Sequence, residues 1–140
     1  FAVSAARLAL PDTGLISYGE MVAQGRNVCE AVSIPVIGDA DTGYGNAVNV
    51  KRTVRGYAAA GFACAMIEDQ VAPKRCGHTR GKPVVSREEC QVRTDSAGAR
   101  RRHGRPHAEC PGLVGGGGNH PAVAFPADHH RSSPEFRAAD

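Results

Sequence analysis

Two short apolar runs, separated by a stretch of helical periodicity, constrain the fold of this chain more than any other feature. The runs IPVIGD, at 34–39, and CAMIED, at 64–69, have the composition of strands buried on both faces. Between them, apolar residues recur at helical spacing over 46–62. A strand, a helix and a strand within about 35 residues form a βαβ unit with parallel strands. The sequence therefore predicts an α/β fold.

Further helices are predicted on both sides of this unit. Ser17 and Glu20 have the spacing of a capping box, and the apolar positions that follow form one stripe at helical spacing. Ser86 and Glu89 repeat that spacing at the start of another helix. The polar segment 70–85 between the unit and this helix is rich in Gly, Pro and basic residues. Loops of this length in compact domains are usually lids or binding loops.

The composition changes after about residue 92. Residues 93–140 contain no Ile, Met, Tyr or Lys and a single Leu, but hold five of the six histidines. Because so few large apolar side chains cannot offset the entropy of ordering the segment, we predict that it is disordered. Its Arg, Gly, His, Pro and Ala bias is also typical of a GC-rich sequence read out of frame, so a frameshift is a second hypothesis. The chain thus divides into 1–92 and a low-complexity tail, 93–140.

Composition excludes several classes of protein. No run approaches the roughly 20 apolar residues of a membrane span, and the first residues lack the features of a signal peptide. We therefore expect an intracellular protein with no membrane partner. The five cysteines form no C-x-x-C pair, which argues against a zinc ribbon or a disulfide framework. A formal charge of +3 is too small to indicate a nucleic-acid partner, and the basic cluster at 100–105 is typical of a solvated run.

Acidic residues follow both predicted strands. Asp39 and Asp41 come at the end of the first, and Glu68 and Asp69 at the end of the second. Because the carboxyl ends of parallel strands meet at one edge of a sheet, we expect these side chains to converge. Oxygen-only ligands are those that Mg²⁺ prefers, and a small anionic substrate can complete its shell. The alternative is that Asp39 and Asp41 cap the following turn and helix.

A glycine-rich turn between a strand and a helix can also cradle a dinucleotide. In GYGNAV, at 43–48, Val48 replaces the third glycine of that fingerprint. The two aspartates ahead of the turn would also repel a pyrophosphate. A metal site is therefore favoured over a nucleotide site.

Cys76 is the second candidate for chemistry, because it lies in KRCGH between Lys74 and His78. Cationic neighbours favour the thiolate, which separates a reactive cysteine from an inert buried one. Cys29 and Cys64 lie in apolar runs and are expected to fill the core. For Cys76 the alternative is an incidental surface thiol beside an ordinary loop histidine.

LPDTGLIS, DADTGYGN, IEDQ, and KRCGH followed by VVSREE occur in this order within residues 1–92. Together they resemble the isocitrate lyase and phosphoenolpyruvate mutase superfamily, above all its short members: methylisocitrate lyases, dimethylmalate lyases and proteins labelled carboxyvinyl-carboxyphosphonate phosphorylmutase. The resemblance implies a (β/α)8 barrel of the TIM type, of which this chain holds a part. It also implies a homotetramer for the complete protein.

The resemblance implies roles for four acidic residues. Asp39 and Asp41 would hold Mg²⁺, which Mn²⁺ could replace, and Glu68 would support the metal shell. Asp12 and Asp39 would contact a 2-hydroxy or 2-oxo carboxylate substrate.

The loop residues match the family's lid. Cys76 and Gly77 correspond to positions that touch substrate, with Cys76 as catalytic acid or base and Lys74 and His78 as its charged catalytic neighbours. Family members that carry this cysteine cleave carbon–carbon bonds. The implied reaction is therefore Mg²⁺-dependent cleavage of a 2-hydroxy di- or tricarboxylate to a 2-oxo acid and a carboxylate. Phosphorylmutase activity, oxaloacetate hydrolysis and a non-catalytic truncated product are the alternatives.

The chain also departs from the family pattern. The family's first strand precedes residue 1, and the VRTDS segment at 92–96 resembles a substrate-binding strand end of the family that arrives too early, with Arg93 at the position of its arginine. A barrel lacking strands exposes edges and core. We therefore expect the 140-residue chain to be unstable and inactive on its own, and Mg²⁺-dependent turnover by the purified chain would contradict this.

Overall fold

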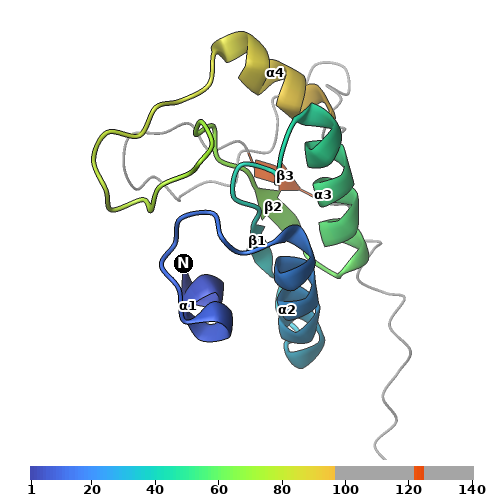
Figure 1. The fold of residues 1–140 in the computed structure, drawn as a ribbon. Helices are drawn as coiled ribbons and strands as arrows, with labels where there is room; N and C mark the ends of the chain where they lie inside the picture. Colours follow the sequence, from blue (N-terminus) through green and yellow to red (C-terminus); the bar gives the residue numbers. More distant parts are fainter. Residues whose placement is uncertain (97–121, 125–140) are drawn as a thin grey trace, which may run out of the picture.

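The computed structural model describes residues 1–96 and 122–124. Its elements are α1 (Ala2–Leu8), α2 (Tyr18–Ala31), β1 (Ile37–Asp39), α3 (Ala47–Ala59), β2 (Cys64–Met66), α4 (Arg87–Ser96) and β3 (Ala122–Ala124) (Figure 1). The strands β1 and β2 pair in parallel and are joined by α3, which confirms the predicted βαβ unit. β2 is the central strand of the sheet, and α3 packs against β2, α2 and α4.

The helices begin largely at the predicted residues, where local hydrogen bonds cap their first turns. Ser17 caps α2, and both bonds of its capping box with Glu20 are present. Asn46 caps α3 in the same way, with Asn49 as its partner. At the start of α4, the hydroxyl of Ser86 accepts the Glu89 amide at 3.2 Å.

The core forms where α3 meets β2. Val50 and Tyr57 of α3 are fully buried, and the predicted burial of β2 is confirmed, because Ala65 is inaccessible and Cys64 is 3% exposed. Burial on both faces is wrong for β1, whose Ile37 is 51% exposed. Within the described residues β1 pairs only with β2, so one side of it has no neighbouring strand.

The apolar stripe of α2 is buried only near its start. Met21 and Gly25 are buried, whereas Val28 and the C-cap Val32 are about 40% exposed. The described residues hold no helix that is both long and apolar enough to cross a membrane.

Order extends beyond the predicted boundary at residue 92. Helix α4 continues to Ser96, and β3 pairs antiparallel with β2, so disorder of 93–140 is wrong for these two segments. An antiparallel strand also differs from a (β/α)8 barrel, in which all strands are parallel. The rest of the predicted tail lies outside the described residues.

Phe62 fits between two glycines. A Cβ atom at Gly25 of α2 would lie 2.0 Å from the Phe62 ring, and one at Gly38 of β1 would lie 2.7 Å from it. The ring stacks on Tyr57 with a centroid separation of 4.7 Å, so it has little freedom to move. The two glycines therefore set how closely α2 and β1 approach the core.

Gly25→Ala is expected to destabilise the chain by about 1 to 3 kcal/mol, because the added methyl overpacks this contact. Gly19→Ala is the matched control on the same helix, since a Cβ there has only the Ser17 hydroxyl at 4.0 Å as a neighbour. Removing that glycine should stabilise α2 by up to about 1 kcal/mol. The midpoint of urea unfolding, followed by circular dichroism, should shift in opposite directions; equal shifts would contradict the packing assignment.

Candidate functional site

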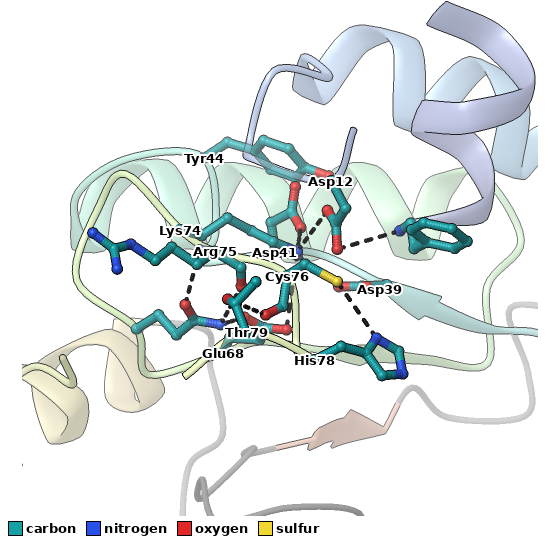
Figure 2. Close-up of polar contacts among 12 residues, drawn as sticks. Asp12, Asp39, Asp41, Tyr44, Glu68, Lys74, Arg75, Cys76, His78 and Thr79 are labelled. Atoms are coloured by element: carbon teal, nitrogen blue, oxygen red, sulfur yellow. Dashed lines mark hydrogen bonds and ion pairs between the residues drawn. The ribbon is translucent and has the colours of Figure 1, made fainter. Parts of the chain in front are cut away.

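The ammonium of Lys74 lies among three carboxylates (Figure 2). It bonds to Asp41 Oδ1, and it lies 3.1 Å from Asp12 Oδ1 and 3.9 Å from Glu68 Oε1. The Lys74 side chain is 3% exposed. Asp12 also pairs with the amino group of Phe1 at 3.7 Å. Side chains from three separate segments therefore meet at one buried point.

The pairing of β1 with β2 brings two of these carboxylates together. Beyond the strands, the Ala40 amide donates to Met66 at 2.8 Å, and the Glu68 amide donates to the Asp41 carbonyl at 2.7 Å. The predicted convergence of acids at this edge of the sheet is confirmed for Asp41 and Glu68.

Asp39 faces the cluster without contacting Lys74. Its Oδ1 accepts the Asp41 amide at 2.9 Å, so this carboxylate caps the turn, as one alternative expected. The helix α3 is capped by Asn46 instead, and Asp41 points to Lys74. Asp41 has a left-handed φ of 49°, which an aspartate tolerates better than most residues.

Two hydroxyl groups of α3 donate hydrogen bonds to the backbone of the segment 39–43, called the acidic loop here. Tyr57 donates to the Asp39 carbonyl at 2.8 Å, and Thr53 donates to the Gly43 carbonyl at 3.0 Å. The Tyr44 hydroxyl lies 3.1 Å from the Tyr57 hydroxyl. Because the Tyr57 proton is donated to the Asp39 carbonyl, Tyr44 is the donor in this second bond. These contacts were not predicted, although Tyr57 lies in the segment 46–62 that was predicted to be helical.

Electrostatics at the cluster follow from its burial. Burial raises the pKa of Asp41, and the hydrogen bond and charge of Lys74 offset this only in part. For Lys74, burial alone would lower the pKa, but the hydrogen bond and charge of Asp41 outweigh it and raise the pKa. Lys74 is therefore charged at neutral pH.

Gln70 links the loop that carries Cys76 to the cluster through hydrogen bonds and was also not predicted. Its amide nitrogen donates to Glu68 Oε2 and, at 3.1 Å, to the Arg75 carbonyl, while its oxygen accepts the Arg75 amide at 3.0 Å. The position of this glutamine directly after the IED run is the signal in the sequence that could have indicated this.

The predicted catalytic loop residues lie next to this anchor. Cys76 Sγ is 3.5 Å from His78 Nδ1, so the predicted pair is formed. Gly77 is exposed, with no atom within 4 Å of a Cβ built on it. Cys76 is half-buried.

A cavity of about 310 Å³ opens beside the carboxylates. Asp12, Asp39 and Asp41 are among its lining residues, together with mostly apolar residues of α1, α2, β1 and the segments next to them. The three aspartates assigned to metal or substrate by the family resemblance therefore share one cavity, large enough for a small carboxylate.

The donor set suits a divalent ion. Three carboxylates surround a single ammonium, and carboxylate oxygens are the ligands that Mg²⁺ prefers. In the part of the chain that the structure describes, no three His, Cys, Asp or Glu side chains form a group ready to hold a metal ion. Lys74 lies between the carboxylates that would have to approach one another. The chemistry of the site fits the metal, provided that the ammonium moves.

Arg93 lies in α4 rather than at a strand end. Its guanidinium pairs with Glu89 at 2.6 Å and reaches the Thr42 carbonyl at 3.5 Å, while its Nε is buried with no partner among the residues that the structure describes. The VRTDS segment is therefore similar in sequence to a strand-end motif of the family, but in this fold it lies in a helix.

Comparisons with known proteins agree with this arrangement. The chain is 57% identical over 86 residues to 2,3-dimethylmalate lyase of Eubacterium barkeri, covering 61% of this chain and 30% of the relative. It is 51% identical over 98 residues to the chloroplastic carboxyvinyl-carboxyphosphonate phosphorylmutase of Arabidopsis thaliana, covering 69% and 29%. The chain therefore spans less than a third of the length of these two relatives.

Solved structures are similar over the same region. Oxaloacetate acetylhydrolase bound to 3,3-difluorooxalacetate matches with a TM-score of 0.65 and 42% identity, over 69% of this chain and 33% of its own. Phosphonopyruvate hydrolase bound to oxalate and Mg²⁺ matches with a TM-score of 0.60 and 37% identity, over 69% of this chain and 32% of its own.

The family model for phosphoenolpyruvate phosphomutase matches residues 1–108, beyond the predicted limit at residue 92. The chain belongs to the phosphoenolpyruvate phosphomutase family, within the PEP mutase/isocitrate lyase superfamily.

Proposed function

We propose that this chain carries part of the active site of a Mg²⁺-dependent carbon–carbon lyase. Its substrate is a 2-hydroxy di- or tricarboxylate, such as a methylisocitrate- or dimethylmalate-like acid, and its products are a 2-oxo acid and a carboxylate. The observation that supports this most is the contact of Lys74, in the KRCGH segment, with Asp12 and Asp41. It joins the thiol-bearing loop to the acidic end of a cavity.

Asp39 and Asp41 would hold the Mg²⁺, with Glu68 supporting the metal shell and Asp12 beside it, and Mn²⁺ could replace it. The ion supplies positive charge that favours deprotonation of the substrate hydroxyl. A phosphonopyruvate hydrolase of similar fold binds Mg²⁺ and oxalate, a small dicarboxylate of the kind proposed here.

The residues of the chain would then handle the protons. The hydroxyl proton passes to a carboxylate of the cluster, the hydroxyl-bearing carbon becomes the carbonyl of the 2-oxo acid, and the adjacent carbon–carbon bond breaks. Its electron pair remains on the second carbon, which takes the Cys76 thiol proton. His78, with Nδ1 at 3.5 Å from Sγ, can stabilise the thiolate left behind.

Oxaloacetate hydrolysis is the second candidate, because an oxaloacetate acetylhydrolase has a TM-score of 0.65 to this chain. Phosphorylmutase activity and a non-catalytic product remain further alternatives. The complete protein is proposed to be a homotetramer.

A chimaera tests the function, since the chain spans only part of its relatives. Residues 1–96 would replace the matching part of the Eubacterium barkeri 2,3-dimethylmalate lyase; this protein is called the lyase chimaera below. We expect it to cleave dimethylmalate or methylisocitrate with Mg²⁺ and to lose activity with a chelator. Turnover of oxaloacetate or a phosphonate alone would favour the other candidates.

A further inference from the structure

Lys74 occupies the space among the carboxylates proposed to bind the divalent ion. Its ammonium contacts Asp41, lies 3.1 Å from Asp12 and 3.9 Å from Glu68, and is almost fully buried. These three carboxylates are themselves about 90% buried. Buried carboxylates without a counter-charge are strongly destabilising. A cation is therefore needed among them, and the Lys74 ammonium supplies it when no metal ion is bound.

An ammonium and a divalent ion cannot both use these oxygens. Lysine carries a compact point charge, and a Mg²⁺ or Mn²⁺ ion on the same carboxylates would lie only a few Å from it. At such a separation two positive charges in a buried site repel each other strongly. The long, flexible lysine side chain is the partner that can leave, because Asp41 and Glu68 are positioned by the ends of two paired strands.

We propose that Lys74 is an internal counter-ion that occupies the carboxylate site until a divalent ion displaces it, so that metal binding releases the lid segment 74–78. This inference rests on the metal assignment of the proposed function. It adds a coupling between two parts of the site: the same event that loads the ion frees the loop carrying Cys76.

The contacts of the other lid residues indicate how the accessibility of Cys76 would change after Lys74 leaves. Next to Lys74, Arg75 is held through its backbone by Gln70, with bonds of 3.0 and 3.1 Å. Cys76 then contacts His78, which is exposed and belongs to the same segment. Once Lys74 leaves the cluster, Cys76 should become more accessible.

The first test measures binding of Mn²⁺ to the lyase chimaera, called the unmodified chain in these tests, by titration calorimetry at about 0.15 M salt, where long-range charge effects are screened. Lys74→Met should bind Mn²⁺ about tenfold more tightly than the unmodified chain, the effect of removing one competing charged hydrogen bond. Lys82→Met removes the same charge from the same loop, where Lys82 donates to the Gly77 carbonyl at 2.8 Å rather than to the carboxylates, and should leave the affinity unchanged. Equal affinities for Lys74→Met and the unmodified chain would overturn the proposal.

Folding of the variant gives a second readout. Without metal, Lys74→Met removes the ammonium that three buried carboxylates share, so Mn²⁺ should raise its melting temperature more than that of the unmodified chain. A variant that stays unfolded in saturating Mn²⁺ would also overturn the proposal, since the carboxylates would then need the ammonium itself. If neither protein binds Mn²⁺, the metal assignment fails and the inference fails with it.

Release of the lid is measured separately, as the rate at which iodoacetamide alkylates Cys76, located by mass spectrometry. Mn²⁺ without substrate should increase this rate in the unmodified chain, whereas in Lys74→Met the rate should already be high and should not respond. Tighter binding in the variant with no response of Cys76 in the unmodified chain would overturn the coupling to the lid.

Discussion

Replacing Cys76 with serine in the lyase chimaera is expected to lower the rate of cleavage by about 100- to 10,000-fold, the range of a lost general acid. A serine hydroxyl has nearly the size of the thiol but is a far weaker acid, so it cannot deliver a proton to the carbanion. Because Cys76 is not one of the proposed metal ligands, the affinity for Mn²⁺ should not change. The loss should therefore appear in kcat rather than in metal binding.

Steady-state rates with dimethylmalate and Mn²⁺ titrations of the same samples check this prediction. Cys29→Ser is the matched control, because it makes the same exchange in a half-buried cysteine of α2, on another element. It should retain nearly full activity. A Cys76→Ser chimaera with more than about a tenth of the starting rate would remove this thiol from the mechanism, since general acids contribute more than that.

Features that depend on neighbours in sequence were predicted well. The capping box of Ser17 and Glu20 is set by a spacing of three residues, and the burial of Val50 and Tyr57 follows from helical periodicity. The approach of Asp41 to Glu68 could also be predicted, because parallel strands bring their carboxyl ends to the same edge.

Features that depend on distant partners were not. The exposure of Ile37 is decided by whether another strand lies beside β1, which the composition of β1 does not encode. Lys74 was assigned beside Cys76 as a charged neighbour, but its ion pair with Asp41 spans 33 positions through a loop without periodicity. The bond from Tyr57 to the Asp39 carbonyl likewise joins an apparent core residue to the acidic loop.

Tyr44 and Tyr57 also make the fold sensitive to alkaline pH. Burial, together with the neighbouring tyrosine, raises the pKa of Tyr44, and burial raises the pKa of Tyr57 despite the bond from Tyr44. In the unfolded chain both titrate near their usual value of 10.0. Above that pH the unfolded state binds fewer protons than the folded state, so the free energy of unfolding should fall by about 1.4 kcal/mol per pH unit for each tyrosine. Below it, their contribution to stability is fully retained.

Tyr44→Phe in the lyase chimaera isolates this effect, because it removes one titrating group and keeps the bond from Tyr57 to Asp39. Near neutral pH the variant should be less stable by about 1 kcal/mol, through the lost hydrogen bond. Between about pH 10 and pH 11 the difference should shrink and then reverse, since the unmodified chimaera loses stability faster. Urea unfolding at a series of pH values would reveal the crossing. Parallel curves, or a tyrosinate absorbance that develops in the folded protein near pH 10, would mean that these hydroxyls are open to solvent and do not hold the acidic loop in place.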